Sequence, residues 1–350
     1  AIRVTTKLIV SLSVLTIGAL LTWPAAVAHH SRVNFDLDAV IEISGTVARW
    51  QYRNPHAFLH LDVINDEGET ERWVVELGSI VNLKQIDMHR DTLAVGDTVT
   101  VLANPEKNPR NNYVFFKSLT TDDGRQFAFA DVFKYSPNAA AKPGESGSTD
   151  FTGIWDEVAT PRSSLITAGP PDYPVTAAGK AILDRYDPAE EPGNTCGEDG
   201  LPKLIRSLYA IVITKDADAY YQEYEFYGVQ RTIHMNTRER PADIAPSDYG
   251  HSIGWMEGDT LVVDTIGFKP AKWGIGDGLD SSEQKRVVER YVLKDEGRLM
   301  EVTYTVTDPV YLAEPFSQTH VKRFVPGYEI TEYEPCDPEA ARMHLDIEQN

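Results

Sequence analysis

One uncharged run near the N-terminus constrains the chain more than any other feature. It extends from Leu8 to Ala28, 21 residues without Asp, Glu, Lys or Arg, and Arg3 and Lys7 precede it. At about 1.5 Å per residue, a helix of this length is about 31 Å long, which matches a bilayer hydrocarbon core of about 30 Å. Positive charge before the run favours a cytoplasmic N-terminus. The pattern predicts that the rest of the chain is exported across a membrane.

Two fates of this segment remain open. Pro24 and the small residues Ala26-Val27-Ala28 are typical of a signal-peptide cleavage site. The chain nevertheless begins at Ala1 and retains the whole run, so we expect an uncleaved signal anchor in residues 1–28, with Trp23 at the far membrane interface. Apolar residues at three- and four-residue spacing form one stripe of the expected helix: Leu8, Leu12, Leu15 and Ala19.

The acidic balance of the chain limits its partners. The formal net charge is -20 at pH 7 over 350 residues, whereas nucleic acids and anionic lipids both attract Lys and Arg. We therefore expect no nucleic-acid partner, and contact with the membrane only through the one helix. A hydrophobic share of 42% is sufficient for the cores of two domains.

The chain has two cysteines, Cys196 and Cys336. In an exported protein such a pair predicts a disulfide bond. Acidic neighbours of each cysteine raise the pKa of its thiol and make it a poor nucleophile, which disfavours redox or metal chemistry. Two free buried thiols remain the alternative.

Alternating apolar and polar residues predict short strands in the first half of the exported part. VIEISGTVARWQY and VGDTVTVLANP alternate, and hairpin turns are expected at Asp66-Glu67-Gly68 and Asp123-Gly124. VNLKQIDMHRDTL predicts a short helix. Five or six strands with one small helix in residues 29–135 predict a compact β-barrel of the OB type. The Pro-, Gly- and Ser-rich stretch 136–150 predicts a linker.

Residues 151–336 are expected to form a second, larger β domain. An irregular insert at 159–204, with a helix expected at 176–186, precedes a series of hairpins. Their turns are expected near Asp216 and at 257–259, 295–297 and 326–327. About nine strands in up-and-down order predict a closed antiparallel meander barrel of lipocalin type. Residues 337–350 are expected to be a helical, exposed tail.

Two stretches resemble known families. AHHSRVNFD, GTVARWQYRNPHAFLHLDV and VGDTVTV, within about residues 28–130, resemble a family of uncharacterised exported bacterial proteins with a His-His-Ser lead and an Asn-Pro-His motif. That resemblance implies an extracytoplasmic β domain without an assigned activity. YGHSIGWMEGDTLVVDTIGF and VVERY resemble a second bacterial family without an assigned reaction.

The second domain also resembles the calycins and lipocalins through DFTGIWDEV and a late arginine. The resemblance implies that Gly153 and Trp155 on the first strand pack under Arg323 on the last strand and close the barrel. Lipocalins usually hold an apolar ligand, so a small-molecule ligand of the second barrel remains open.

Candidate sites are few. His29 and His30 are weak candidates for copper, because a chelating N-terminal amine requires cleavage after Ala28. The aromatic residues Tyr220, Tyr224 and Trp255 are candidates for a ligand pocket, although core packing explains them equally well. We expect no catalytic residues and no cofactor, since the sequence has no Gly-x-Ser-x-Gly, phosphate-loop or haem-attachment motif.

The sequence favours a non-enzymatic, membrane-anchored accessory subunit of an energy-converting membrane complex, respiratory or photosynthetic. It is expected in a bacterial inner membrane as a single-pass protein with both β domains in the periplasm. Its expected partners are integral membrane subunits. A lipocalin-like binder of a small apolar ligand and an exported copper-binding protein remain alternatives.

Overall fold

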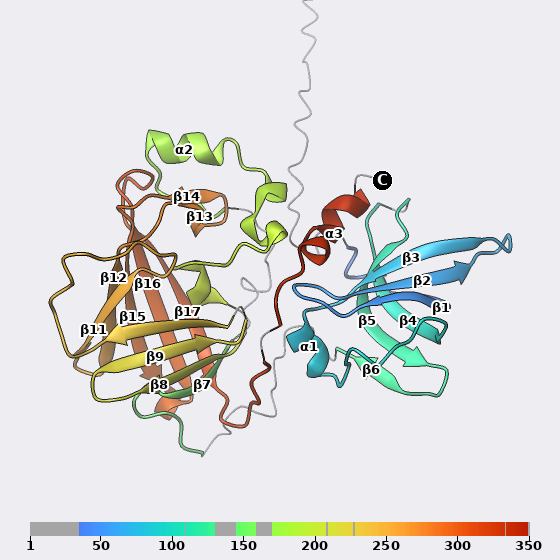
Figure 1. Cartoon of the computed structure of the whole chain (residues 1–350), viewed down its shortest axis with the longest axis horizontal. Coiled ribbons are helices and arrows are strands. Elements are labelled where there is room, and N and C mark those ends of the chain that lie inside the picture. Colours follow the sequence, from blue (N-terminus) through green and yellow to red (C-terminus); the bar gives the residue numbers. More distant parts are fainter. Residues whose placement is uncertain are drawn as a thin grey trace, which may run out of the picture.

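The computed structural model describes residues 35–348 apart from residues 109, 130–144, 159–169, 208, 227 and 333. The described chain is mainly β and contains two barrels with few helices (Figure 1). The predicted anchor lies outside the described residues. Among the helices of residues 35–348, none is long and apolar enough to cross a membrane.

The first barrel contains five strands, and a sixth short strand extends its sheet. The strands follow the order β3-β2-β1-β4-β5-β6, and a parallel pairing of β3 with β5 closes the barrel. One short helix, α1, follows β3 and begins at the Ser79 cap, whose side chain accepts the N–H of Asn82. The predicted strands, hairpins and short helix are thus confirmed. Their bounds are β1 (Ile41–Gln51), β2 (Phe58–Ile64), β3 (Thr70–Glu76), α1 (Ile80–Lys84), β4 (Thr98–Pro105), β5 (Tyr113–Thr121) and β6 (Gln126–Ala128).

The second barrel is a closed ring of nine strands in near-sequential order. Each strand pairs antiparallel with its neighbours except β10 and β11, which pair in parallel over two residue positions. An odd number of strands cannot alternate direction all the way around a ring, so one parallel pair is required. The strands are β7 (Gly153–Glu157), β8 (Ile211–Lys215), β9 (Ala219–Tyr224), β10 (Val229–His234), β11 (His251–Glu257), β12 (Thr260–Ile266), β15 (Arg286–Lys294), β16 (Leu299–Thr307) and β17 (Phe316–Phe324).

Most of the predicted hairpins of this barrel form, and one does not. The turns after β8, β11 and β15 are where the sequence placed them. The hairpin expected at Pro326-Gly327 is wrong, because residues 325–332 contain no strand. The last strand, β17, already pairs with β7 and closes the ring, so no free edge remains for a further strand.

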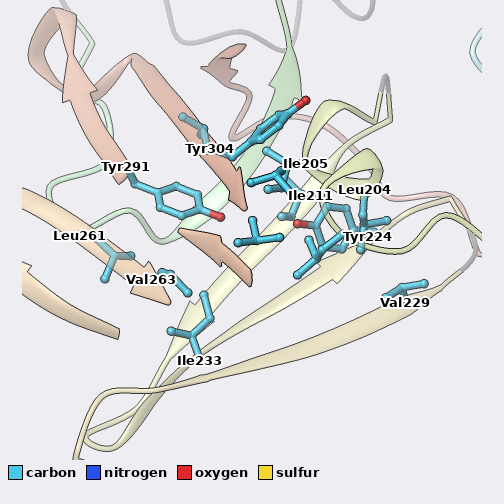
Figure 2. Packing of buried hydrophobic residues seen from close by; sticks show 14 of the residues in the cluster. Leu204, Ile205, Ile211, Tyr224, Val229, Ile233, Leu261, Val263, Tyr291 and Tyr304 are labelled. Carbon is cyan, nitrogen blue, oxygen red and sulfur yellow. The ribbon is translucent and has the colours of Figure 1, made fainter. Parts of the chain in front are cut away.

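Short elements of the insert and of the loop after β12 cover one end of the second barrel (Figure 1). Leu204 and Ile205 of η4 belong to the barrel core, so the insert contributes to the core as well as covering it. Figure 2 shows both residues beside Tyr224 and Ile211 of the strands. The remaining elements are α2 (Ala177–Leu183), η2 (Pro188–Glu190), η3 (Pro192–Thr195), η4 (Lys203–Arg206), β13 (Ala271–Gly276), β14 (Leu279–Ser281) and η5 (Asp295–Gly297).

The C-terminal segment, residues 325–348, leaves the second barrel and ends on the first. Cys336 forms the predicted disulfide bond with Cys196 and also a β-bridge with Asn54 of the first barrel. The helix α3 (Pro338–Glu348) then buries Ala340 in a cluster with Phe35, Phe58, Tyr113 and Phe115. The tail is helical as predicted, but the expectation that it is exposed is wrong, because its small residues fit against an aromatic surface of the first barrel.

Polar contacts accompany this packing. Arg53 forms ion pairs with Asp337 at 2.6 Å and with Glu339 at 3.5 Å. The Tyr328 hydroxyl donates to Glu225 of the second barrel at 2.9 Å and accepts from Gln85 beside α1 at 3.1 Å. The C-terminal segment therefore connects the two barrels through a covalent bond, apolar contacts and ion pairs.

Candidate functional site

A cavity of about 520 Å³ lies among the short elements that cover the end of the second barrel. The turn after α2 contributes Arg185 and Tyr186, β13 contributes Lys272 and Trp273, and β14 contributes Asp280. A volume of this size falls within the usual range of small-molecule sites. This cavity is the candidate functional site.

The helix α2 is fixed against the segment that follows β16. Thr176 caps the helix by accepting the N–H of Gly179 at 3.1 Å, and its hydroxyl donates to the Val310 carbonyl at 2.6 Å. Gly179 passes close to the Tyr311 carbonyl, where a Cβ would lie 2.2 Å from the oxygen. Only glycine permits this approach, which brings α2 and Tyr311 together beside the cavity.

The β13–β14 hairpin holds an aromatic residue in an unusual backbone conformation. Trp273 has a φ of 54°, which is a genuine outlier for a bulky residue. Asp280 stabilises this conformation by accepting the Trp273 N–H at 3.0 Å. The indole ring stacks on Tyr186 with centroids 5.3 Å apart. Gly278, at a φ of 76°, leaves room for the Tyr186 ring.

The polar groups around the cavity include both signs of charge. Lys272 pairs with Glu190 at 2.6 Å, and both side chains are exposed. Burial, with a smaller contribution from Asp277, raises the pKa of Tyr186 to about 12, so its hydroxyl remains neutral. Ser281 also lines the cavity, and its buried Oγ has no hydrogen-bond partner among the residues that the structure describes.

Two buried residues fix the hairpin to the barrel. Asp308 accepts the Ser282 N–H at 2.6 Å and the Ser282 hydroxyl at 2.8 Å. Lys285 donates to the carbonyls of Leu201 and Gly274, at 2.8 and 2.9 Å, and lies over the ring of Phe268. These bonds position the cavity relative to the strands below it.

The interior of the second barrel is occupied by side chains that bond to one another. Arg231 forms two hydrogen bonds with Glu289, at 2.6 and 2.9 Å, and also donates to Ser252 and Thr265. Tyr291 donates to Glu289 at 2.5 Å. Charges buried in this way are stable only when they are paired and hydrogen-bonded. The interior is therefore more polar than a pocket for an apolar ligand would require.

A second polar cluster lies where the last strand meets the first. Lys322 contacts Glu157 at 2.9 Å, and His320 contacts the other carboxylate oxygen at 3.0 Å. Burial alone would raise the pKa of the Glu157 carboxyl, but Lys322 and His320 lower it below its ordinary value. The cluster keeps a buried carboxylate ionised at the seam of the ring.

The residues expected to close the barrel lie at this seam. Trp155 is fully buried and donates to the Phe151 carbonyl at 2.8 Å. The register pairs Trp155 with Phe324 and places Arg323 opposite Asp156. The ring that covers Trp155 is thus Phe324, 5.2 Å away, which also lies against Gly153, whereas Arg323 forms an ion pair with Asp156.

The three aromatic residues expected around a pocket do not lie together. Tyr220 and Tyr224 are buried on the inner face of β9. Trp255 is on the face of β11 opposite to the inward Ser252, where it donates to Glu257 and lies under Arg238. Side chains alternate along a strand, so the odd-numbered Trp255 cannot share the interior with Ser252.

Other expected site residues lie outside the described part of the chain: His29, His30, Leu8, Leu12, Leu15, Ala19 and Trp23. Within the described ranges, no group of three or more His, Cys, Asp or Glu is arranged to hold a metal ion. Sequence reasoning missed the cavity. The Trp-Gly and Asp-Gly pairs of KWGIGDG are the one signal that marks its hairpin.

Three exposed apolar residues belong to the first barrel, two of them within five positions of Phe35 in the sequence. We call Leu37, Val40 and Leu102 the β1–β4 patch; their exposed fractions are 47%, 50% and 38%. Asn104 donates to the carbonyls of Leu37 and Ala39 and so fixes the segment before β1 against β4. Leu102 pairs with Glu42, two residues from Val40, so Val40 and Leu102 are diagonal neighbours on one face.

Comparison with known proteins finds a family model that matches part of the chain and a solved structure of low similarity. The model of a family of unknown function, DUF6152, matches residues 19–114. No curated protein matches the sequence. Among solved structures, a mutant of the fluorescent protein UnaG is similar at 14% sequence identity and a TM-score of 0.24, over 50% of this chain and 96% of that chain.

Proposed function

We propose that this protein is a non-enzymatic, membrane-anchored accessory subunit of an energy-converting membrane complex, with both barrels in the periplasm. The observation that supports the proposal best is the β1–β4 patch. Soluble surfaces tolerate single exposed apolar residues, but grouped ones are typical of contact sites. This group adjoins Phe35, the residue at which the described chain emerges from the N-terminal segment.

Chain length relates the patch to the proposed anchor. Six residues, 29–34, separate Ala28 from Phe35. At about 3.3–3.6 Å per extended residue they span at most about 25 Å. If the uncharged run ends at the periplasmic face of the membrane, the patch must remain near that face and near any membrane partner.

The joined barrels suit a structural role. The disulfide, α3 and the ion pairs of Arg53 connect the two barrels at several points. A partner bound to one barrel would therefore also position the other. In this proposal the first barrel is of the OB type, on the basis of its parallel β3–β5 closure, and the second is of the calycin type.

The charge around the patch indicates what a partner would present. Asp36, Asp38 and Glu42 are exposed beside it. An interface with an apolar centre and complementary charge at its rim would need Lys or Arg on the partner. We therefore expect an integral membrane subunit with a basic periplasmic rim.

The test compares matched pairs of substitutions. Val40→Asp with Leu102→Asp should reduce co-purification with the complex from native membranes, because both place charge in the proposed contact. Ile64→Asp with Val95→Asp is the control, since Ile64 and Val95 are more exposed, at 66% and 73%, and lie outside the patch. Equal thermal unfolding of both variants would exclude misfolding as the cause.

Replacement of residues 1–28 by an ordinary cleavable signal completes the test. Both barrels should fold, and co-purification should be lost. Full co-purification of that variant, or isolation of the intact protein without partners from mild detergent, contradicts the proposal. An N-terminal sequence that begins at His29 would also contradict the anchor and would favour the copper alternative.

A further inference from the structure

The cavity beside β13 and β14 has features that the subunit role does not require. Trp273 is held at a positive φ, a backbone conformation that is strained for a bulky residue. The buried Oγ of Ser281 lacks a partner within the described residues, which is also unfavourable. Strain and unsatisfied polar groups are typical of sites that contact a ligand. Both occur here in residues that line one cavity.

The charges of the lining disfavour a charged ligand. Three carboxylates, of Asp187, Glu190 and Asp280, would repel an anion, and Arg185 and Lys272 would repel a cation. An ionised carboxylate has about four acceptor positions. The Trp273 N–H uses one of those of Asp280, and the Ala189 N–H uses one of those of Asp187. Acceptor capacity therefore remains for a ligand that donates hydrogen bonds.

An entirely apolar ligand fits no better. It would bury the carboxylates without replacing their bonds to water, and it would leave the Ser281 hydroxyl without a partner, which is unfavourable. Tyr186 and Trp273 nevertheless provide a stacked aromatic surface, with ring planes 27° apart. The ligand that satisfies both conditions has a ring with C–H groups to lie against an aromatic side chain, and hydroxyls that both donate and accept.

We propose that this cavity binds a neutral polyhydroxylated ring, such as a sugar unit. Tyr186 contacts the ring and Asp280 accepts hydrogen bonds from its hydroxyls. Ser281 turns about χ1 to bond to the ligand through its buried Oγ, which has no hydrogen-bond partner among the described residues. Asp280 has a second role, because the same carboxylate fixes the Trp273 conformation. The proposal is independent of the membrane partner, since the cavity lies on the second barrel and the β1–β4 patch on the first.

The full-length protein is titrated with maltose and with N-acetylglucosamine, and binding is followed by tryptophan fluorescence and calorimetry. Citrate and putrescine serve as anionic and cationic probes. We expect saturable binding of at least one sugar with a Kd in the millimolar range and no binding of the charged probes. Failure of both sugars to bind at tens of millimolar, or preferential binding of citrate or putrescine, overturns the proposal.

Three substitutions locate the site. Tyr186→Ala should weaken sugar binding at least tenfold. Asp280→Asn retains an acceptor for the Trp273 N–H, so it should weaken binding without unfolding the hairpin. Ser281→Ala removes an unsatisfied group, so it should weaken binding while thermal stability without sugar is unchanged or higher.

Tyr221→Ala is the control, because Tyr221 is 40% exposed and lies outside the cavity. Sugar affinity that is unchanged in all three cavity variants, or reduced equally in the control, shows that the sugar binds elsewhere and overturns the proposal.

Discussion

Lys285 differs from two other buried cations of the second barrel, Arg231 and Lys322. Arg231 and Lys322 each contact a carboxylate, whereas the Lys285 ammonium contacts two neutral carbonyls. Burial lowers the pKa of Lys285 to about 7 from its ordinary 10.5, although Asp308 and Asp248 act in the opposite direction. Such a group makes the stability of the folded protein depend on pH.

The sign of this dependence follows from proton binding. Between about pH 7 and pH 10.5 the unfolded chain holds a proton on Lys285 that the folded protein does not, so the free energy of unfolding rises with pH in this window. We compare the free energy of unfolding of the unsubstituted protein with that of Lys285→Met. The value for the unsubstituted protein minus the value for the variant should increase by about 1 kcal/mol per pH unit between pH 7.5 and 9. Urea denaturation at three pH values measures it. A constant difference would mean that Lys285 stays protonated in the fold.

At the scale of elements, the sequence predicts the long strands well. It predicts poorly the short elements that cover one end of the second barrel. Long strands such as β15 and β16 alternate regularly between buried and less buried residues, and that period is visible in the sequence. β13 and β14 are short, and side-chain bonds accompany their pairing: Asp280 accepts the N–H of Trp273, and Asp308, 26 positions further along the chain, accepts the N–H of Ser282. No local pattern specifies such bonds, so the cavity could not be predicted.

The pairing register between β7 and β17 is also not predictable from the sequence pattern. The resemblance to calycins implies that Arg323 covers Trp155, whereas in the structure Arg323 lies opposite Asp156 and Phe324 lies opposite Trp155. A shift of one residue places a side chain on the other face of the sheet. The pattern of the sequence alone does not determine that parity between strands so distant in the chain.

The disulfide bond stabilises this arrangement of elements. It joins residues separated by 140 positions, and chain entropy gives such a cross-link at most about 5 kcal/mol. We expect Cys196→Ser with Cys336→Ser to lower the free energy of unfolding by about 2–4 kcal/mol, measured by urea denaturation. Native protein treated with reductant is the control and should match the variant. Unchanged stability in both would show that the non-covalent contacts suffice.

For the whole molecule, the C-terminal segment is part of both barrels. It begins beside β7, where the Val325 N–H donates to the Ile154 carbonyl at 2.9 Å, and it ends on the aromatic surface of the first barrel (Figure 1). Ala340 is fully buried there. The sequence predicts a separate, exposed tail from residue 337, whereas α3 packs on the first barrel.

Ala340→Asp tests this role of α3. The substitution buries an unpaired carboxylate against Phe35 and Phe58, so we expect α3 to detach, with a loss of about 2 kcal/mol or more. Limited proteolysis should then cut rapidly within residues 325–348. Arg342→Asp introduces the same side chain at an exposed position of α3 and should resist cleavage like the native protein. Equal cleavage of both variants would contradict the role.

The position of α3 has a consequence for biogenesis. A chain that crosses a membrane from its N-terminus delivers the strands of the first barrel before any strand of the second, and the helix that covers Phe35, Phe58, Tyr113 and Phe115 follows only after both. In the export proposed above, the first barrel therefore has an uncovered aromatic surface until α3 arrives. A premature stop anywhere in the second barrel would damage the first, so truncated products should be cleared as whole chains and should not accumulate as a stable N-terminal fragment.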